Sequence, residues 1–178
     1  MNAEIQKILQ MNHIHGGLLA QAIHQDIREL FLKEICTYMK SSPARSLEIR
    51  KLYFRSYDDL QTVRTIVRRV CGGALPDEDL IWLNRCIRAH LHKKSRRRQI
   101  PDEERADLWR AQGGLCAICR RSVEPEGFHV DHIVPWDYVG DELPDNLQVL
   151  CPDCNWLKND RVARALHNLF LPPKGVSS

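Results

Sequence analysis

The chain has 178 residues, enough for one ordinary domain or two small modules, and a formal net charge of only +3. This value hides an asymmetry: residues 1–100 hold 18 Lys+Arg against 10 Asp+Glu, a net of +8, and residues 101–178 hold 8 against 13, a net of −5. No apolar run is long enough to span a membrane, and no secretory signal is recognisable, so we expect a cytoplasmic protein without a membrane segment.

The first hundred residues favour a bundle of four or five helices, because apolar residues recur there at three- and four-residue spacing. Three single cysteines in these patterns are typical of buried thiols in a reducing compartment. The expected helices cover residues 5–9, residues 18–38, a segment after Ser46, a segment from an N-cap at Ser56 to Gly72, and a segment that begins at Pro76. Nothing in this region identifies a chemistry.

The most basic part of the chain follows these helices, with no acidic residue between Asp79 and Asp102. A solvated linker would explain such a charge run, but a strap that contacts phosphates is our preferred interpretation. The candidate nucleic-acid contacts in it are Lys93, Lys94, Arg96, Arg97 and Arg98. We therefore predict a helical domain over residues 1–84, a basic linker over 85–100 and a second domain over 101–178.

The second domain contains two Cys-x-x-Cys pairs, Cys116 with Cys119 and Cys151 with Cys154. Each pair places two thiolates on one tight turn, and two such turns complete the tetrahedral four-sulfur shell that Zn²⁺ prefers. Because four protein ligands leave no open position for water, the predicted zinc is structural rather than catalytic. Two unrelated buried or redox pairs are the alternative.

A histidine motif, residues 129–135 (His-Val-Asp-His-Ile-Val-Pro), lies between the two cysteine pairs, on a strand expected over residues 128–133. Carboxylate and amide oxygens suit Mg²⁺ or Mn²⁺, and a histidine can take a proton from water near neutral pH. On a strand, Asp131 and His132 point to opposite faces unless the strand ends or bends there. Such a set is suited to the hydrolysis of a phosphodiester.

The sequence from Asp131 to Pro135, together with the run from Asn146 to Lys158, closely resembles the HNH endonucleases whose ββα-metal site is clasped by a four-cysteine zinc. The resemblance covers roughly residues 104–162. It implies an α+β fold class, with an N-terminal helical bundle followed by a small ββα-metal (HNH) nuclease domain. It also implies single-metal hydrolysis of DNA that leaves 5′-phosphate and 3′-hydroxyl ends.

The resemblance also assigns roles to individual residues. His132 matches the general base, and Asp131 matches the carboxylate that binds the catalytic Mg²⁺ or Mn²⁺. Asn155, at the start of a final helix expected over residues 155–170, completes the metal site, and Asn146 braces the loop and orients the histidine. Lys158, one turn after Asn155, is placed to meet a phosphate. Trp156 is expected in the core rather than stacked on a base.

The leading function is therefore a DNA endonuclease, of a kind found in phage defence, restriction or phage DNA processing. One alternative is a nuclease subunit that acts only within a larger complex. Another is a zinc-ribbon protein that binds nucleic acid without catalysis. For the N-terminal helices, three roles are open: dimerisation, DNA binding and docking onto a larger assembly.

Overall fold

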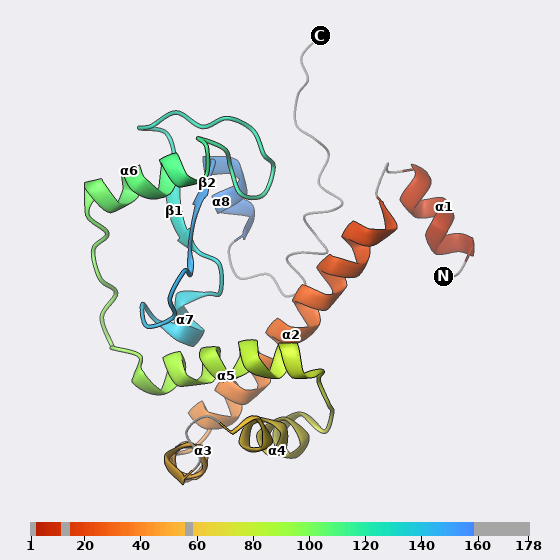
Figure 1. Cartoon of the computed structure of the whole chain (residues 1–178), viewed down its shortest axis with the longest axis vertical. Helices are drawn as coiled ribbons and strands as arrows, with labels where there is room; N and C mark the ends of the chain where they lie inside the picture. The colour runs from red at the N-terminus through yellow and green to blue at the C-terminus, as the bar shows by residue number, and fades with distance from the viewer. Residues whose placement is uncertain (1–2, 12–14, 56–58, 159–178) are drawn as a thin grey trace. The chain divides into compact units, whose positions relative to one another are not determined.

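The structure, a computed structural model, describes residues 3–11, 15–55 and 59–158 (Figure 1). Contacts divide the chain into two units. The helical unit consists of the described parts of residues 28–101 and 132–147. The cysteine unit consists of the described parts of residues 1–27, 102–131 and 148–178. The fold class is α+β, as predicted: helices dominate, and one small antiparallel sheet of two strands is present in the described chain.

The N-terminal helices follow the predicted pattern. Helix α1 spans Ala3–Met11, and α2 spans Gly16–Lys40, begins in the cysteine unit and ends in the helical unit. Helix α3 covers Pro43–Arg55, so it begins before Ser46, because proline is well suited to a first helical turn. Among the described residues, no helix is long and apolar enough to cross a membrane.

Two helices with well-defined ends complete the helical bundle (Figure 1). Helix α4 spans Leu60–Cys71, and its N-cap is Asp59, whose side chain accepts a hydrogen bond of 2.8 Å from the backbone N–H of Gln61. The expected cap at Ser56 lies outside the described residues. Helix α4 ends at Gly72, whose φ of 66° is the left-handed conformation that glycine adopts without strain. Helix α5 spans Asp77–His92 and is acidic in its first turn.

The core of the helical unit joins these helices to the loop that contains the histidine motif. Helix α4 packs against α3 and α5, and α5 packs against the short helix α7, Trp136–Val139. The buried core includes Leu32, Ile35, Ile49, Val63, Ile66, Leu80, Leu83 and Ile87 from the helices, with Val134 and Val139 from the loop. Contacts thus group residues 132–147 with the helices. The domain boundaries predicted from the sequence, 1–84, 85–100 and 101–178, describe parts that fold separately. They stay a prediction.

The cysteine unit contains the remaining elements. Helix α6 covers Asp102–Ala111, strand β1 His129–His132, strand β2 Leu147–Leu150 and helix α8 Pro152–Lys158. The last residue of β1, His132, and the first of β2, Leu147, are grouped with the helical unit. The strands pair side by side (Figure 1). A small core of Val123, Phe128, Val149 and Leu150 surrounds Cys116, Cys151 and Cys154. Helix α8 begins three residues earlier than expected, since Pro152 suits a first turn, and its continuation beyond Lys158 lies outside the described residues.

Candidate functional site

The four paired cysteines come together in the cysteine unit. Their sulfur atoms all lie within 4.8 Å of one another, as a four-sulfur metal site requires. Each pair sits on a tight turn: the backbone N–H of Arg120 donates to the carbonyl of Cys116, and the backbone N–H of Cys154 donates to Sγ of Cys151 at 3.4 Å. Soft thiolates in this arrangement fit Zn²⁺ and offer no position for a catalytic water.

An arginine that sequence reasoning missed lies beside these thiols. Arg121 donates from Nε to Sγ of Cys119 at 3.3 Å and from Nη2 to Sγ of Cys151 at 3.5 Å, and it forms an ion pair with Asp153 at 3.1 Å. Burial opposes ionisation of Cys119, but the hydrogen bonds from Arg121 outweigh it and lower the pKa of this thiol to about 6. Arg121 therefore favours the thiolate form that binds metal.

Strand β1 delivers the two central residues of the histidine motif to different surroundings. The strand ends at His132, and its side chains alternate in direction, so Asp131 and His132 have different neighbours. The Asp131 carboxylate lies in the cysteine unit, where its Oδ2 pairs with Nζ of Lys158 and accepts a hydrogen bond of 3.3 Å from Nε2 of Gln148. Asp131 is half-buried, and both of these donors are long side chains.

Helix α8 places two of the predicted residues on one face. Asn155 and Lys158 are three residues apart, so their side chains project from the same side of the helix. Lys158 pairs with Asp131, and Asn155 is a half-buried residue one turn earlier on α8. The carboxylate of Asp131 and the amide oxygen of Asn155 are ligand types that suit Mg²⁺ or Mn²⁺, which keep several waters and bind substrate phosphate. The ammonium of Lys158 shows that a cation is already accommodated beside this carboxylate. Trp156 is 71% exposed, so its predicted place in the core is wrong; it projects from another side of α8 than Asn155.

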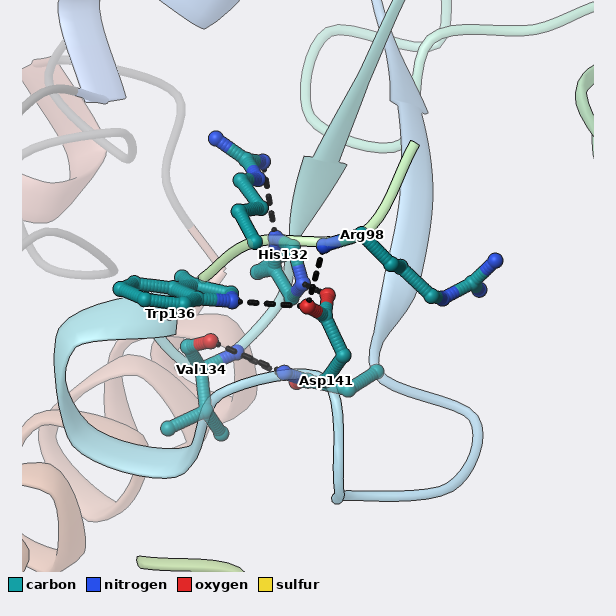
Figure 2. Close-up of polar contacts among 7 residues, drawn as sticks. Arg98, His132, Val134, Trp136 and Asp141 are labelled. Carbon is teal, nitrogen blue, oxygen red and sulfur yellow. Dashed lines mark hydrogen bonds and ion pairs between the residues drawn. The ribbon is translucent and has the colours of Figure 1, made fainter. Parts of the chain in front are cut away.

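His132 is enclosed in the helical unit, with only 3% of its surface exposed. Figure 2 shows its ring between two charged groups. The ring atom Nδ1 lies 2.9 Å from Nη2 of Arg97, and Nε2 lies 3.0 Å from Oδ1 of Asp141. Both ring nitrogens therefore have a charged partner, one of each sign.

Asp141 is the second residue that sequence reasoning missed. Its Oδ2 accepts two further hydrogen bonds, from the backbone N–H of Arg98 at 2.9 Å and from Nε1 of Trp136 at 3.0 Å (Figure 2). Burial opposes the charge, but these donors and His132 outweigh it and lower the pKa of Asp141. Gly140, directly before Asp141, has a φ of 63°, and a Cβ added to it would lie 2.8 Å from Cγ of Lys93. The turn that leads into Asp141 therefore requires glycine.

Asn146 ties the two ends of the loop together. Its Oδ1 accepts from the backbone N–H of Val134 at 2.7 Å, and its Nδ2 donates to the carbonyl of Val134 at 3.0 Å. Its own carbonyl accepts from the backbone N–H of Ile133 at 2.8 Å, directly after His132. The two bonds of the side chain are buried, and all three bonds fix the backbone that follows the histidine.

The basic segment lies along the same loop, within the helical unit. Lys93 donates to the carbonyl of Asp137 at 3.0 Å and stacks its ammonium 3.9 Å from the ring centre of Trp136. Lys94 lies 3.6 Å from Glu142, and Arg96 is exposed. Two neighbours of Arg96 reach the histidine network, Arg97 through its side chain and Arg98 through its backbone. The segment from Lys93 to Arg98 is therefore non-helical chain that bends at Ser95 and Arg96 and contacts the His132 loop.

Comparison with known protein families gave a match over part of the chain. Residues 116–161 match the family model of the HNH endonuclease, a range that includes both cysteine pairs and the histidine motif. Neither the curated proteins nor the solved structures gave a match to this chain.

Proposed function

We propose that this protein is a metal-dependent DNA endonuclease with His132 as its general base, because residues 116–161 match the family model of the HNH endonuclease. One observation carries the proposal. His132 is buried between a carboxylate and a guanidinium and follows Asp131 directly in the chain. A histidine held in this way suits the abstraction of a proton from water beside an anionic phosphate.

The other predicted residues would bind the metal ions or hold the backbone in place. Asp131 and Asn155 would hold the Mg²⁺ or Mn²⁺, and Asn146 keeps the backbone after His132 in place. A bound divalent cation supplies Lewis-acid stabilisation of the phosphate and of the leaving oxygen. The four cysteines would hold a structural Zn²⁺, which supports the small core of the cysteine unit. One such site cuts one strand, so cutting both strands needs two sites or repeated action.

The basic segment supplies the contacts to the DNA backbone in this proposal. Its lysines and arginines lie beside the His132 loop, and Lys158 lies beside Asp131. The double variant Arg96→Glu and Arg98→Glu should weaken DNA binding and flatten its salt dependence, since each lost phosphate contact lowers the slope by about 0.9. The double variant keeps the hydrogen bond between Arg97 and His132. If its affinity for DNA equals that of the wild type, Arg96 and Arg98 do not contact the DNA backbone.

A plasmid assay tests the proposed activity. Supercoiled plasmid is incubated with zinc-loaded protein and Mg²⁺ or Mn²⁺, beside an EDTA control, and open-circular or linear DNA is measured. We expect His132→Ala to lower the rate roughly 100-fold or more. His129→Ala is the matched control, because His129 is exposed on the same strand. Cutting that survives in EDTA or in His132→Ala contradicts the proposal.

Two alternatives give different outcomes in the same assay. Binding of DNA without cutting, even when cell extract is added, favours a zinc-ribbon binding protein. Cutting only with extract favours a nuclease that acts within a complex. Exposed apolar residues on α1 and α2, among them Ile8, Ile23 and Ile27, support a role for these helices in a homodimer or larger assembly. Analytical ultracentrifugation of wild type and Ile23→Glu/Ile27→Glu tests the homodimer, since a monomeric wild type excludes it.

A further inference from the structure

We propose that Asp141 is a positioning residue that holds His132 as the Nε2–H tautomer and thereby leaves Nδ1 as the atom that accepts the proton. The role of His132 as a base rests on the proposed function, whereas its tautomer does not. The hydrogen bonds that carry this inference lie wholly within the helical unit. They join His132 and Asp141 to each other and to Arg97, Arg98 and Trp136 (Figure 2).

The tautomer follows from what each partner can do. A guanidinium only donates hydrogen bonds, so Nδ1 of His132, 2.9 Å from Nη2 of Arg97, must accept. A carboxylate only accepts, so Nε2, 3.0 Å from Oδ1 of Asp141, must donate. Both contacts therefore select one neutral form, with the proton on Nε2. A doubly protonated ring would direct an N–H at the cationic Arg97 and lose that hydrogen bond.

Asp141 is itself held in one orientation. Its Oδ2 accepts from the backbone N–H of Arg98 and from the indole of Trp136, which leaves Oδ1 for the imidazole. Only 13% of its side chain is exposed, so water competes weakly for these bonds. Backbone and indole donors cannot rotate away as a lysine can. The imidazole is consequently fixed in position and in tautomer before substrate binds.

Arg97 donates a hydrogen bond to Nδ1 of His132, the atom that accepts the proton in this proposal. Nδ1 can take a proton from water only after its hydrogen bond to Arg97 is broken. The guanidinium is a strong phosphate ligand, so the arriving DNA backbone offers it an alternative partner. Proton transfer then moves one proton from water to Nδ1, and the resulting imidazolium is stabilised by the Asp141 carboxylate on its other side.

Exchange of the carboxylate for an amide gives a sharp test. In Asp141→Asn, the amide oxygen should face the two donors Arg98 and Trp136, because the NH₂ group cannot accept from them. The NH₂ group is then directed at Nε2 of His132, which must accept, and the proton moves to Nδ1. Asp141→Ala removes the carboxylate without imposing either tautomer. The amide variant should therefore be the more damaging of the two, because it imposes the wrong tautomer, which is also how an amide in place of the carboxylate of a catalytic triad acts.

The matched control is Asp137→Asn, the same chemical change in the same loop at an exposed residue whose side chain is not part of the network. We expect Asp141→Asn to lower the plasmid nicking rate roughly 100-fold or more, Asp141→Ala to lower it less, and Asp137→Asn to leave it unchanged. Thermal unfolding of each variant identifies any loss that reflects misfolding.

The direct readout is the tautomer itself, measured by two-bond ¹H–¹⁵N correlation spectra of the full-length, zinc-loaded protein labelled with ¹⁵N-histidine. The His132 signals are identified by their loss in His132→Ala. We expect protonated Nε2 in wild type and protonated Nδ1 in Asp141→Asn. Protonated Nδ1 in wild type would overturn the inference, as would an unchanged tautomer or nicking rate in a folded Asp141→Asn. A wild type with the expected tautomer but no nicking would instead contradict the proposed function alone.

Discussion

Asp131 and His132 are joined by one peptide bond, yet their side chains are held in different ways. The partners of Asp131 are Lys158 and Gln148, two long side chains that can rotate away. The partner of His132 at Nε2 is Asp141, a carboxylate fixed by a backbone N–H and an indole. Adjacent residues of one strand thus differ in how firmly they are held: the carboxylate of Asp131 has exchangeable partners, whereas the imidazole of His132 is fixed. A metal ligand must release its partners when the ion arrives, whereas a base must keep its orientation.

The largest expected effect comes from removing the exchangeable carboxylate. Asp131→Asn should lower the nicking rate by about 10³-fold, because the hard anionic ligand for Mg²⁺ is lost and several kcal/mol of charge stabilisation depend on the ion. The loss should be partly recovered at high Mn²⁺ concentration. Asp107→Asn, at an exposed carboxylate paired with Arg110 on α6, is the control and should keep full activity. If Asp131→Asn cuts as fast as wild type at low Mg²⁺, the assignment of Asp131 as a metal ligand is wrong.

The sequence predicted the parts of the site that depend on residue type and spacing. Two Cys-x-x-Cys pairs specify a four-sulfur cluster whatever the rest of the fold, and the sulfur atoms are grouped as expected. Helix ends were predicted where proline or glycine limits the backbone, as at Gly72, but the first residue of α8 was placed too late. Terminal positions are the least reliable part of any helix prediction.

The partners of the motif residues could not be predicted in this way. Asp141 and Arg97 stand nine residues after and thirty-five residues before His132, and only the folded loop brings them to its ring. The only local signals were Gly140, which allows the turn before Asp141, and Arg121, which directly follows the first cysteine pair. Trp156 was misplaced because apolarity predicts burial only on the helix face that meets a core, and α8 contributes Cys154 rather than Trp156 to the small core of the cysteine unit.

A second, smaller effect tests the rigidity of the His132 loop. Asn146→Ala leaves the buried N–H and carbonyl of Val134 without partners, which should lower the free energy of unfolding by on the order of 2–4 kcal/mol. Asn146→Asp keeps the acceptor but buries a carboxylate with one oxygen facing the carbonyl of Val134, so it should be at least as destabilising. Chemical denaturation measures both values, and nicking is compared at a temperature where each variant is folded. Equal stability of Asn146→Ala and wild type would show that the loop does not depend on this residue.

A third effect concerns the indole that helps to fix Asp141. Trp136→Phe removes one of the two donors to Oδ2 and keeps the backbone N–H of Arg98. One lost hydrogen bond is worth about 1 kcal/mol, so we expect the nicking rate to fall about 5-fold while affinity for Mn²⁺ stays the same. A loss as large as that of His132→Ala would mean that Trp136 has a further role, such as contact with DNA.

The smallest expected effect probes the exchangeable side of the comparison. Lys158→Met removes the ammonium from Asp131 and keeps a side chain of similar length, while Gln148 remains as a donor. If Lys158 competes with the metal, Mn²⁺ should bind the DNA-free protein a few-fold more tightly. The pair is partly buried, and the cost of desolvating both charges offsets much of their attraction, which leaves a net on the order of 1 kcal/mol. His132→Ala should leave this affinity unchanged. Mn²⁺ binding measured by electron paramagnetic resonance separates the two variants.

The same variant tests the predicted phosphate contact of Lys158. If the released ammonium binds a phosphate once the metal has taken its place, Lys158→Met should weaken DNA binding slightly and lower the salt slope by about 1. Tighter metal binding with unchanged DNA binding would assign Lys158 to Asp131 alone. Weaker metal binding would contradict the exchange itself, because it would mean that Lys158 orients the carboxylate for the ion rather than competing with it.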